Sequence, residues 1–182
     1  MPDQDTADML RVKAGEIDRF TGLVARNQSA MFRYAQSRLS SRGLAEDVVQ
    51  ETFLAVFEAR HAFDPAKSFR GWLWTILVNR CKGAWKKRQN IAATPLGEKE
   101  STLEAKTNQQ LEQAEEREHL AKQLYRLPVE QADAIRMRFF GNLSFAEIGE
   151  AMECTPSTAK SRVRYGLEKL ATALRVEQES QT

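Results

Sequence analysis

The chain has 182 residues, 42% of them hydrophobic, which is enough for one ordinary domain or two small ones. Only 9 glycines and 5 prolines interrupt the helix-forming residues, and no segment alternates apolar with polar residues, so we expect an all-α fold. The net charge of +2 does not by itself indicate a nucleic-acid partner. The acidic, polar N-terminus does not look like a signal peptide, and no apolar run approaches the ~20 residues of a membrane span, which predicts a cytoplasmic protein without membrane insertion.

Residues 1–14 look like a loose lead-in, after which helical periodicity begins. One apolar stripe runs from Ile17 to Leu39, and the segment 40–43 interrupts it. A turn at 61–68 contains Asp64-Pro65. Helices are therefore expected over about 16–39, 44–60 and 69–88.

The second of these helices has an acidic face. Asp47, Glu51 and Glu58 are spaced by four and seven residues and so point the same way, opposite an apolar face. Gln50 lies beside them. This pattern fits either a docking surface for a basic protein element or an ordinary solvated face, and spacing alone does not separate the two.

The segment that follows mixes aromatic residues with cations. Residues 66–90 contain no acid, and they carry Lys67, Arg70, Arg80, Lys82, Lys86, Lys87 and Arg88. Binding to unstacked bases uses a ring for stacking and a cation for the phosphate. The alternative is that Trp72 is mostly core and that the cations are ordinary surface. We expect both to be partly true, and the missing acids favour a phosphate-facing surface.

Composition changes at Gln89, where small, polar and aperiodic residues begin. We assign residues 15–90 to a first helical domain, 91–110 to a flexible linker and 111–177 to a second domain, because so long a structureless stretch is unusual inside one compact domain. Helices are expected near 129–139, 144–152 and 156–176.

The last two of these helices have the pattern of a helix-turn-helix. Ser144 and Glu147 form an S-x-x-E capping box, and Thr155 followed by Pro156 opens the next helix. Short donors and long cations at the start of a helix are suited to base edges and phosphates in a major groove. Here they are Ser157, Thr158, Lys160, Ser161, Arg162 and Arg164. A solvated helical hairpin is the alternative for this motif alone.

The chemistry-bearing residues form no catalytic arrangement and no metal-ligand spacing. Cys81 and Cys154 lie far apart, and neither His61 nor His119 is spaced with them as zinc ligands are, so we expect free buried thiols, no metal and no cofactor. We find no phosphate-binding loop or nucleophile motif, which argues against an enzyme.

Taken in order, these segments resemble the bacterial RNA polymerase sigma factors of the extracytoplasmic-function class. The resemblance rests on the acidic helix AEDVVQETFLAVFEA, the segment FDPAKSFRGWLWTILVNRCKGAWKKR, a polar linker, and LPVEQADAIRMRFFGNLSFAEIGEAM before the last helix. It covers about residues 15–90, called region 2 in this family, and 110–176, called region 4. It implies a factor that binds core RNA polymerase, recognises and melts promoter DNA, and starts transcription. It also implies an anti-sigma factor as a partner.

The resemblance assigns roles to residues at matching positions. It places polymerase binding on the acidic face, with Asp47, Gln50, Glu51 and Glu58. It places melted −10 strand binding on Phe63, Lys67, Arg70, Asn79, Lys82, Lys86 and Arg88, with Phe63 in a pocket for a flipped base, Asn79 reading a base, and Lys82, Lys86 and Arg88 following phosphates. It places −35 duplex binding on Ser157, Thr158, Lys160, Ser161, Arg162, Arg164 and Tyr165, the last two at positions that vary in the family.

Two other functions fit parts of the sequence. A stand-alone helix-turn-helix regulator would bind duplex DNA without polymerase and would need residues 15–90 for dimerisation or ligand binding. An antagonist that mimics both regions would have lost the basic positions, which this chain retains.

Overall fold

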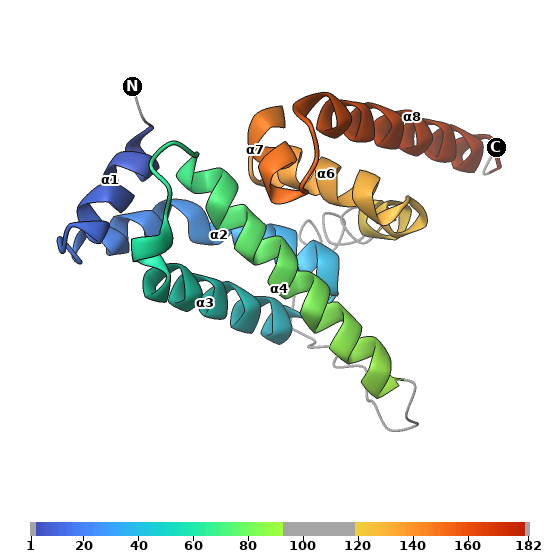
Figure 1. The fold of residues 1–182 in the computed structure, drawn as a ribbon. Coiled ribbons are helices and arrows are strands. Elements are labelled where there is room, and N and C mark those ends of the chain that lie inside the picture. The colour runs from blue at the N-terminus through green and yellow to red at the C-terminus, as the bar shows by residue number, and fades with distance from the viewer. Residues whose placement is uncertain (1–2, 93–118, 181–182) are drawn as a thin grey trace.

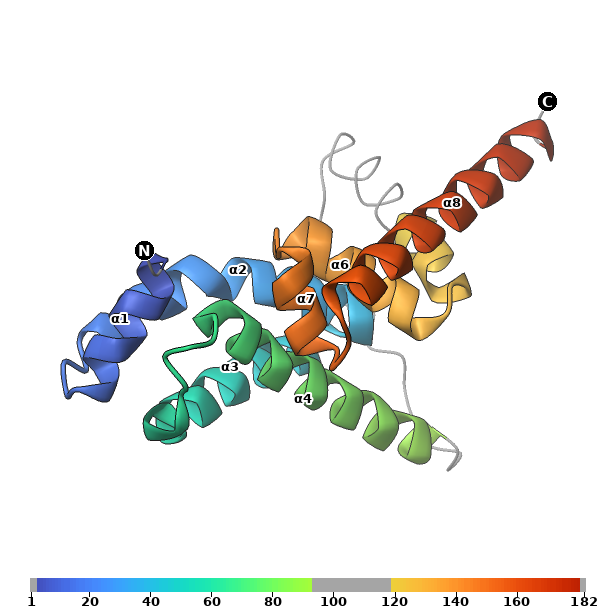
Figure 2. The same cartoon turned by 45° about the horizontal axis from the view of Figure 1, so that its top comes forward.

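The computed structural model describes residues 3–92 and 119–180, and these residues form helices and no strand. We call residues 3–92 the first half and 119–180 the second half. The predicted linker, 91–110, lies outside the described residues except for the end of α4. The helical structure of the described residues confirms the all-α prediction. Figures 1 and 2 show the second half lying across α2 and α4 of the first half.

The first half contains α1 (Gln4–Lys13), α2 (Arg19–Leu39), α3 (Arg42–Glu58), a single 3₁₀ turn η1 (Arg60–Ala62) and α4 (Phe69–Ala92). The expectation of a loose lead-in at 1–14 is wrong, because α1 is capped by Asp3 and buries Met9 and Val12 completely. Ten residues with two buried apolar side chains gain their stability from this packing rather than from propensity.

The predicted break near residues 40–43 is shorter than expected. Ser40 adopts a left-handed conformation, with φ of 52°, which ends α2. Ser41 then caps α3 by accepting a hydrogen bond from the Leu44 amide, so α3 already begins at Arg42. At the other end of the first half, α4 extends to Ala92, four residues beyond the predicted end.

The second half begins with helical residues 119–126, followed by α6 (Val129–Phe140), α7 (Phe145–Ala151) and α8 (Pro156–Ser180). The last helix runs over α6, and its C-terminal end projects away from the rest of the molecule (Figure 2). No helix in the described ranges has the length and apolar character that a bilayer crossing requires.

One hydrophobic core joins the two halves. It includes Leu73, Trp74 and Leu77 of α4 together with Met137 and Ile148 of the second half, all fully buried. Trp74 packs edge-on against Tyr34 with ring centroids 5.3 Å apart. The expectation that Trp72 is mostly core is only partly correct: Trp74 is the fully buried tryptophan, and Trp72 is half-buried.

Candidate nucleic-acid and protein interfaces

Helix α7 begins with the capping box that its sequence predicts. The Ser144 hydroxyl accepts a hydrogen bond from the Glu147 amide at 3.2 Å, and the Glu147 carboxylate accepts one from the Ser144 amide at 2.7 Å. These two bonds satisfy amides that otherwise have no partner in the first turn. The first helix of the helix-turn-helix is therefore fixed at its start.

The turn between α7 and α8 is tight. Glu153 adopts a φ of 53°, and a Cβ on Gly149 would lie 2.7 Å from the carbonyl oxygen of Cys154, so a side chain at 149 would push the turn away. Thr155 caps α8 by accepting a hydrogen bond from the Thr158 amide at 3.1 Å, with Pro156 at the first helical position. Cys154 lies in this turn as a free thiol but is only half-buried, which corrects our expectation of a buried thiol there.

The start of α8 presents polar side chains to solvent. Ser157, Thr158 and Lys160 are exposed, and Ser161 is half-buried. On the same helix Val163 and Ala159 are buried against the core, which fixes the orientation of the exposed face. The structure thus brings together the polar residues expected for groove binding.

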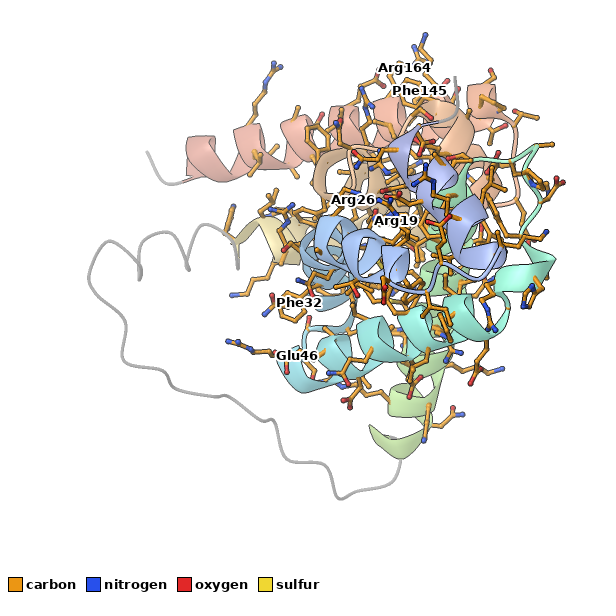
Figure 3. The ribbon with its side chains drawn as sticks, turned by 90° about the vertical axis from the view of Figure 1, so that its left-hand side faces the viewer. Arg19, Arg26, Phe32, Glu46, Phe145 and Arg164 are labelled. Carbon is orange, nitrogen blue, oxygen red and sulfur yellow. The ribbon has the colours of Figure 1, made fainter. Side chains whose placement is uncertain are left out.

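Three other residues expected on this surface have partners within α7, α8 and the turn. Arg162 points back to the turn, 3.5 Å from the Cys154 sulfur. Arg164 is exposed and lies over the ring of Tyr165, 4.5 Å from its centroid, and 4.0 Å from the Glu168 carboxylate. Figure 3 shows Arg164 on the opposite side of the molecule from Glu46 of α3.

The basic face of α4 contains three of the seven residues expected to bind melted DNA. Asn79, Lys82 and Lys86 are exposed and follow one another at helical spacing of three and four residues. They form a continuous strip of one amide and two cations, the chemistry suited to a base edge beside phosphates.

The other four have different surroundings. Phe63 is 1% exposed, with its ring against Phe69 and Trp72, so in this conformation its ring cannot stack on a base. Arg70 donates to the carbonyl of Gly141, and Arg88 donates to the carbonyl of Leu39 at the end of α2. Lys67 is exposed at the tip of the loop before α4.

The acidic face of α3 is exposed along its whole length. Asp47, Gln50, Glu51 and Glu58 all face solvent, and Leu54, 63% exposed, lies among them. A single exposed apolar side chain is normal on a protein surface, so the exposed carboxylates and not Leu54 make this face a candidate docking surface. Arg80 of α4 pairs with Glu51 at 3.0 Å, so this cation faces the acidic strip and not the basic one.

The second half covers the start of α4. The Ser68 hydroxyl donates to Glu147 at 3.1 Å, and a Cβ on Gly71 would lie 1.9 Å from a carboxylate oxygen of Glu150, so α7 packs directly on the helix. Burial raises the pKa of Glu150, and neighbouring Glu147 raises it further, while Lys67 opposes the shift. Two carboxylates of α7 thus lie beside Ser68 and Lys67. They occupy the place where Lys67 would otherwise attract a DNA phosphate.

A buried ion cluster holds the remainder of this contact. Asp133 of α6 lies 3.1 Å from both Arg38 of α2 and Arg136 of α6, and all three side chains are at least 92% buried. Burial raises the pKa of Asp133, and the two guanidinium groups draw it down. Arg136 also donates to Ser37 of α2 at 3.0 Å. A buried charge set of this kind is costly to break by removing one member.

Aromatic rings extend the contact toward the end of α4. Tyr125 stacks on Trp85 with centroids 6.2 Å apart, and its hydroxyl donates to the Arg38 carbonyl at 3.2 Å. Nearby, Cys81 is fully buried, and burial, assisted by the Asp133 carboxylate, raises its pKa to about 12. We call this whole packing of the second half on α2 and α4 the closed arrangement.

Sequence reasoning missed α1 and the Arg38–Asp133–Arg136 cluster. The signal for α1 was present, since Asp3 and Thr6 precede Met9 and Val12 at helical spacing. The cluster had no signal, because its partners are 95 positions apart and resemble ordinary surface charges. In the described residues no group of histidine, cysteine or acidic side chains could hold a metal ion.

Comparison with known proteins identifies the two halves. A family model described as sigma-70 region 2 matches residues 23–91, and one described as sigma-70, region 4 matches residues 117–170. The RNA polymerase sigma factor CarQ of Myxococcus xanthus is 30% identical over 166 residues, which are 91% of this chain and 95% of CarQ. The ECF RNA polymerase sigma-E factor of Haemophilus influenzae is 30% identical over 169 residues, 87% of this chain and 89% of that protein.

A solved structure has the same fold. CnrH, in a structure with the cytosolic domain of CnrY, superimposes with a TM-score of 0.75 over 96% of this chain and 99% of CnrH, at 23% identity.

Proposed function

The chain belongs to the RNA polymerase sigma factors of the extracytoplasmic-function class, and from this we propose that it binds core polymerase in the cytoplasm and directs it to promoters. Its own action is binding rather than catalysis. We assign the two activities to residues 15–90 and 111–177, with 91–110 as the linker, and the two family models support this division.

The observation that carries the proposal is the open start of α8. A capped helix follows a tight turn, and its first residues, Ser157, Thr158 and Lys160, face solvent. This is how a helix-turn-helix presents its second helix to a major groove. We assign the −35 duplex to this surface. Arg164 and Tyr165 lie one turn further along and would reach the flanking phosphates.

The basic face of α4 takes the melted −10 strand in this proposal. Asn79 would read a base edge while Lys82 and Lys86 follow the phosphates, since all three are exposed on one face. Phe63 would support the loop before α4 from beneath, because its ring is buried.

The acidic face of α3 would bind core polymerase. Asp47, Gln50, Glu51 and Glu58 surround exposed Leu54, and α3, which carries them, lies on the side of the molecule away from α8 (Figure 1). Polymerase can therefore bind there without covering the helix-turn-helix. A basic partner element would compete with Arg80 for Glu51.

The closed arrangement has to open before a strand can follow the whole DNA-binding surface of region 2. Arg70 and Ser68 contact the second half, and Glu147 and Glu150 lie over the start of α4. An anti-sigma factor that binds the closed arrangement would keep the chain inactive. CnrH, which shares the fold, was solved with the cytosolic domain of CnrY.

The test is transcription by purified core polymerase with this chain, from promoters randomised separately at the −10 and −35 elements and at two salt concentrations. Asn79→Ala should relax preference at one −10 position, because a base-edge contact is worth about 1–3 kcal/mol of discrimination. Lys86→Ala should weaken all promoters alike and make the salt dependence shallower. Lys160→Ala should alter only the −35 element.

Lys169→Ala is the matched control, because Lys169 is exposed on α8 well beyond its start. If Asn79→Ala changes −35 preference, or lowers every −10 variant equally, the assignment of base reading is wrong. Sequence-specific binding to duplex promoter DNA as a dimer, with no requirement for core polymerase, would instead identify a stand-alone regulator.

A further inference from the structure

The loop before α4 is exposed only at its tip. Asp64, Pro65, Ala66 and Lys67 face solvent, while Phe63 and Phe69 at its two ends are buried. Inside the loop the Asp64 carboxylate accepts a hydrogen bond from the Ala66 amide at 2.9 Å, and the Asp64 carbonyl accepts one from the Lys67 amide at 3.0 Å. The tip is therefore a small turn carried on two fixed ends.

Helix α1 holds both of these ends. Lys13, in the last turn of α1, donates to the carbonyl oxygen of Phe63 at 2.9 Å. Thr6, in the first turn, accepts a hydrogen bond from the amide of Phe69 at 3.1 Å. The Phe69 amide is at the start of α4, where no carbonyl of its own helix is available, so the Thr6 hydroxyl serves as an external cap.

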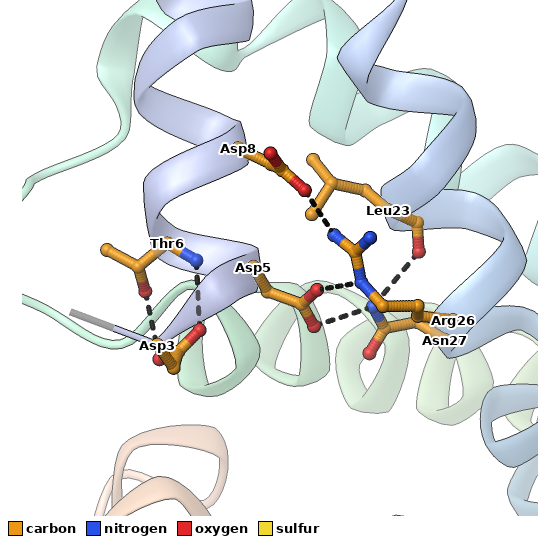
Figure 4. Close-up of polar contacts among 7 residues, drawn as sticks. All are labelled: Asp3, Asp5, Thr6, Asp8, Leu23, Arg26 and Asn27. Carbon is orange, nitrogen blue, oxygen red and sulfur yellow. Dashed lines mark hydrogen bonds and ion pairs between the residues drawn. The ribbon is translucent and has the colours of Figure 1, made fainter.

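Helix α1 is in turn anchored to α2, as Figure 4 shows. Arg26 contacts Asp5 and Asp8 at 2.6 Å each, and Asn27 donates to Asp5 at 2.9 Å. Asp5 is 8% exposed. Charge-assisted bonds to two carboxylates fix both the rotation and the height of α1 against α2.

These contacts all lie within the first half. The Ser68 hydroxyl, by contrast, bonds to Glu147 of the second half, and this contact is lost when the closed arrangement opens. In the open molecule the ends of the loop are then held by the hydrogen bonds to α1 and by the packing of Phe63 on Phe69 and Trp72. The position of the loop in the open molecule matters because Ser68 and Arg70, next to the loop, are released from the second half only on opening.

We propose that Thr6 and Lys13 are positioning residues that fix the loop 64–67 in place for binding the melted −10 strand, without touching DNA themselves. This inference rests on the proposed function of region 2. Hydrogen bonds weaken steeply when misaligned, so a loop that is free to shift loses discrimination between bases before it loses overall affinity.

The test compares Lys13→Met, which removes the donor, with Lys13→Arg, which keeps one. Transcription with core polymerase from promoters randomised at −10 should show that Lys13→Met reduces −10 preference by roughly threefold or more, and that Lys13→Arg restores most of it. Core affinity and −35 preference should stay unchanged. Arg11→Met is the matched control, because Arg11 is exposed on the same helix and its ion pair with Glu16 is long, at 3.9 Å.

Thr6→Val provides a second variant of nearly equal shape, which removes the acceptor at the other end of the loop. Each variant is also unfolded thermally. A lower unfolding temperature with intact −10 preference for both variants overturns the inference and leaves α1 a purely structural helix.

Asp64→Ala, which breaks the turn at the tip, separates this inference from the function beneath it. If Asp64→Ala changes −10 preference and neither α1 variant does, positioning by α1 is wrong and the role of the loop stands. If none of the three changes −10 preference while transcription still depends on the −10 element, the loop is not a reader and both proposals for it are wrong.

Discussion

The start of α8 and the basic face of α4 carry similar side chains but differ in what surrounds them. Among the described residues, the hydrogen bonds of the polar side chains at the start of α8 lie within the turn and α8 itself. Around α4, Ser68 and Arg70 are bonded to the second half, and Trp85 is covered by Tyr125. The closed arrangement therefore covers both ends of one proposed DNA surface, with Asn79, Lys82 and Lys86 exposed between them, and leaves the other surface open along its length.

This difference matches the state of the DNA that each surface is proposed to bind. Duplex −35 DNA exists before polymerase arrives, whereas a melted −10 strand exists only afterwards. A chain that keeps its strand-binding surface closed avoids single-stranded nucleic acid elsewhere, because basic aromatic surfaces bind such strands with little sequence preference. We therefore expect the free chain to bind −35 duplex weakly and −10 strand hardly at all.

Breaking the buried ion cluster should have the largest effect on this comparison. Asp133→Ala leaves Arg38 and Arg136 buried without a counter-charge, which costs about 3–5 kcal/mol in the closed arrangement and nothing once both side chains reach water. The radius of gyration from small-angle scattering should rise, and −10 strand binding should appear without core polymerase. Glu130→Ala, an exposed change on the same helix, is the control. An unchanged radius would show that the cluster does not hold the halves together.

Removing the aromatic contact should have a smaller effect. Tyr125→Ala loses the stacking on Trp85 and the hydrogen bond to Arg38, together worth about 1–2 kcal/mol. Binding of a −10 oligonucleotide by the free chain should become roughly five- to thirtyfold tighter, since affinity follows the open fraction. Tyr125→Phe keeps the ring and loses only the hydrogen bond, so it should have a smaller effect than Tyr125→Ala. Equal effects of both variants would assign the contact to the hydroxyl.

A single methyl group should sharpen the comparison further. In Gly71→Ala the new Cβ would meet the Glu150 carboxylate, which has to rotate away, so closing weakens slightly while α4 gains about 1 kcal/mol of helix propensity. Gly83→Ala is a matched control, because Gly83 lies in the same helix with nothing within 4 Å of its Cβ. Both variants should unfold at higher temperature, but only Gly71→Ala should bind the −10 strand more tightly. If Gly83→Ala does so too, the effect comes from helix stability alone.

Acidity should produce the smallest effect. The pKa of Glu150 is raised in the closed arrangement, mainly by burial, and returns toward its ordinary value on opening. The closed form thus binds the proton more tightly, so lowering the pH below neutral favours closing, and this gain disappears as the pH rises through the raised pKa. Strand binding at constant ionic strength should weaken more on acidification for the parent chain than for Glu150→Gln. Identical pH profiles would contradict the assignment.

Local signals in the sequence predicted local structure well. The Ser144–Glu147 capping box and the Thr155-Pro156 helix start both appear as expected, because each depends on residues at most three positions apart. Helix α1 was missed although its cap and spacing are visible in the sequence, because a helix of ten residues depends on tertiary contacts, here those of Asp5 with α2 and of Thr6 with α4.

For the candidate surfaces, the sequence predicted which kinds of side chain are present but not which of them bond to other segments. The sequence showed many cations in 66–90, but not that Arg70 and Arg88 bond to carbonyls or that Arg80 turns to Glu51. Those outcomes depend on which segments meet in space, and no periodicity within one helix contains that information. The roles of the exposed residues stay predictions until the promoter experiments are done.

The chemical reactivity of the buried Cys81 thiol can report on the separation of the two halves. With a pKa of about 12 and no exposed surface, it cannot react while it stays buried in the core that joins the two halves, whereas Cys154, in the turn of the helix-turn-helix, is only half-buried. The rate at which an alkylating reagent modifies Cys81, divided by the rate at Cys154, then reports the fraction of molecules in which the two halves are separated. An oxidant would obey the same rule, so damage at Cys81 would accumulate in molecules that open without a partner and would spare those that stay shut.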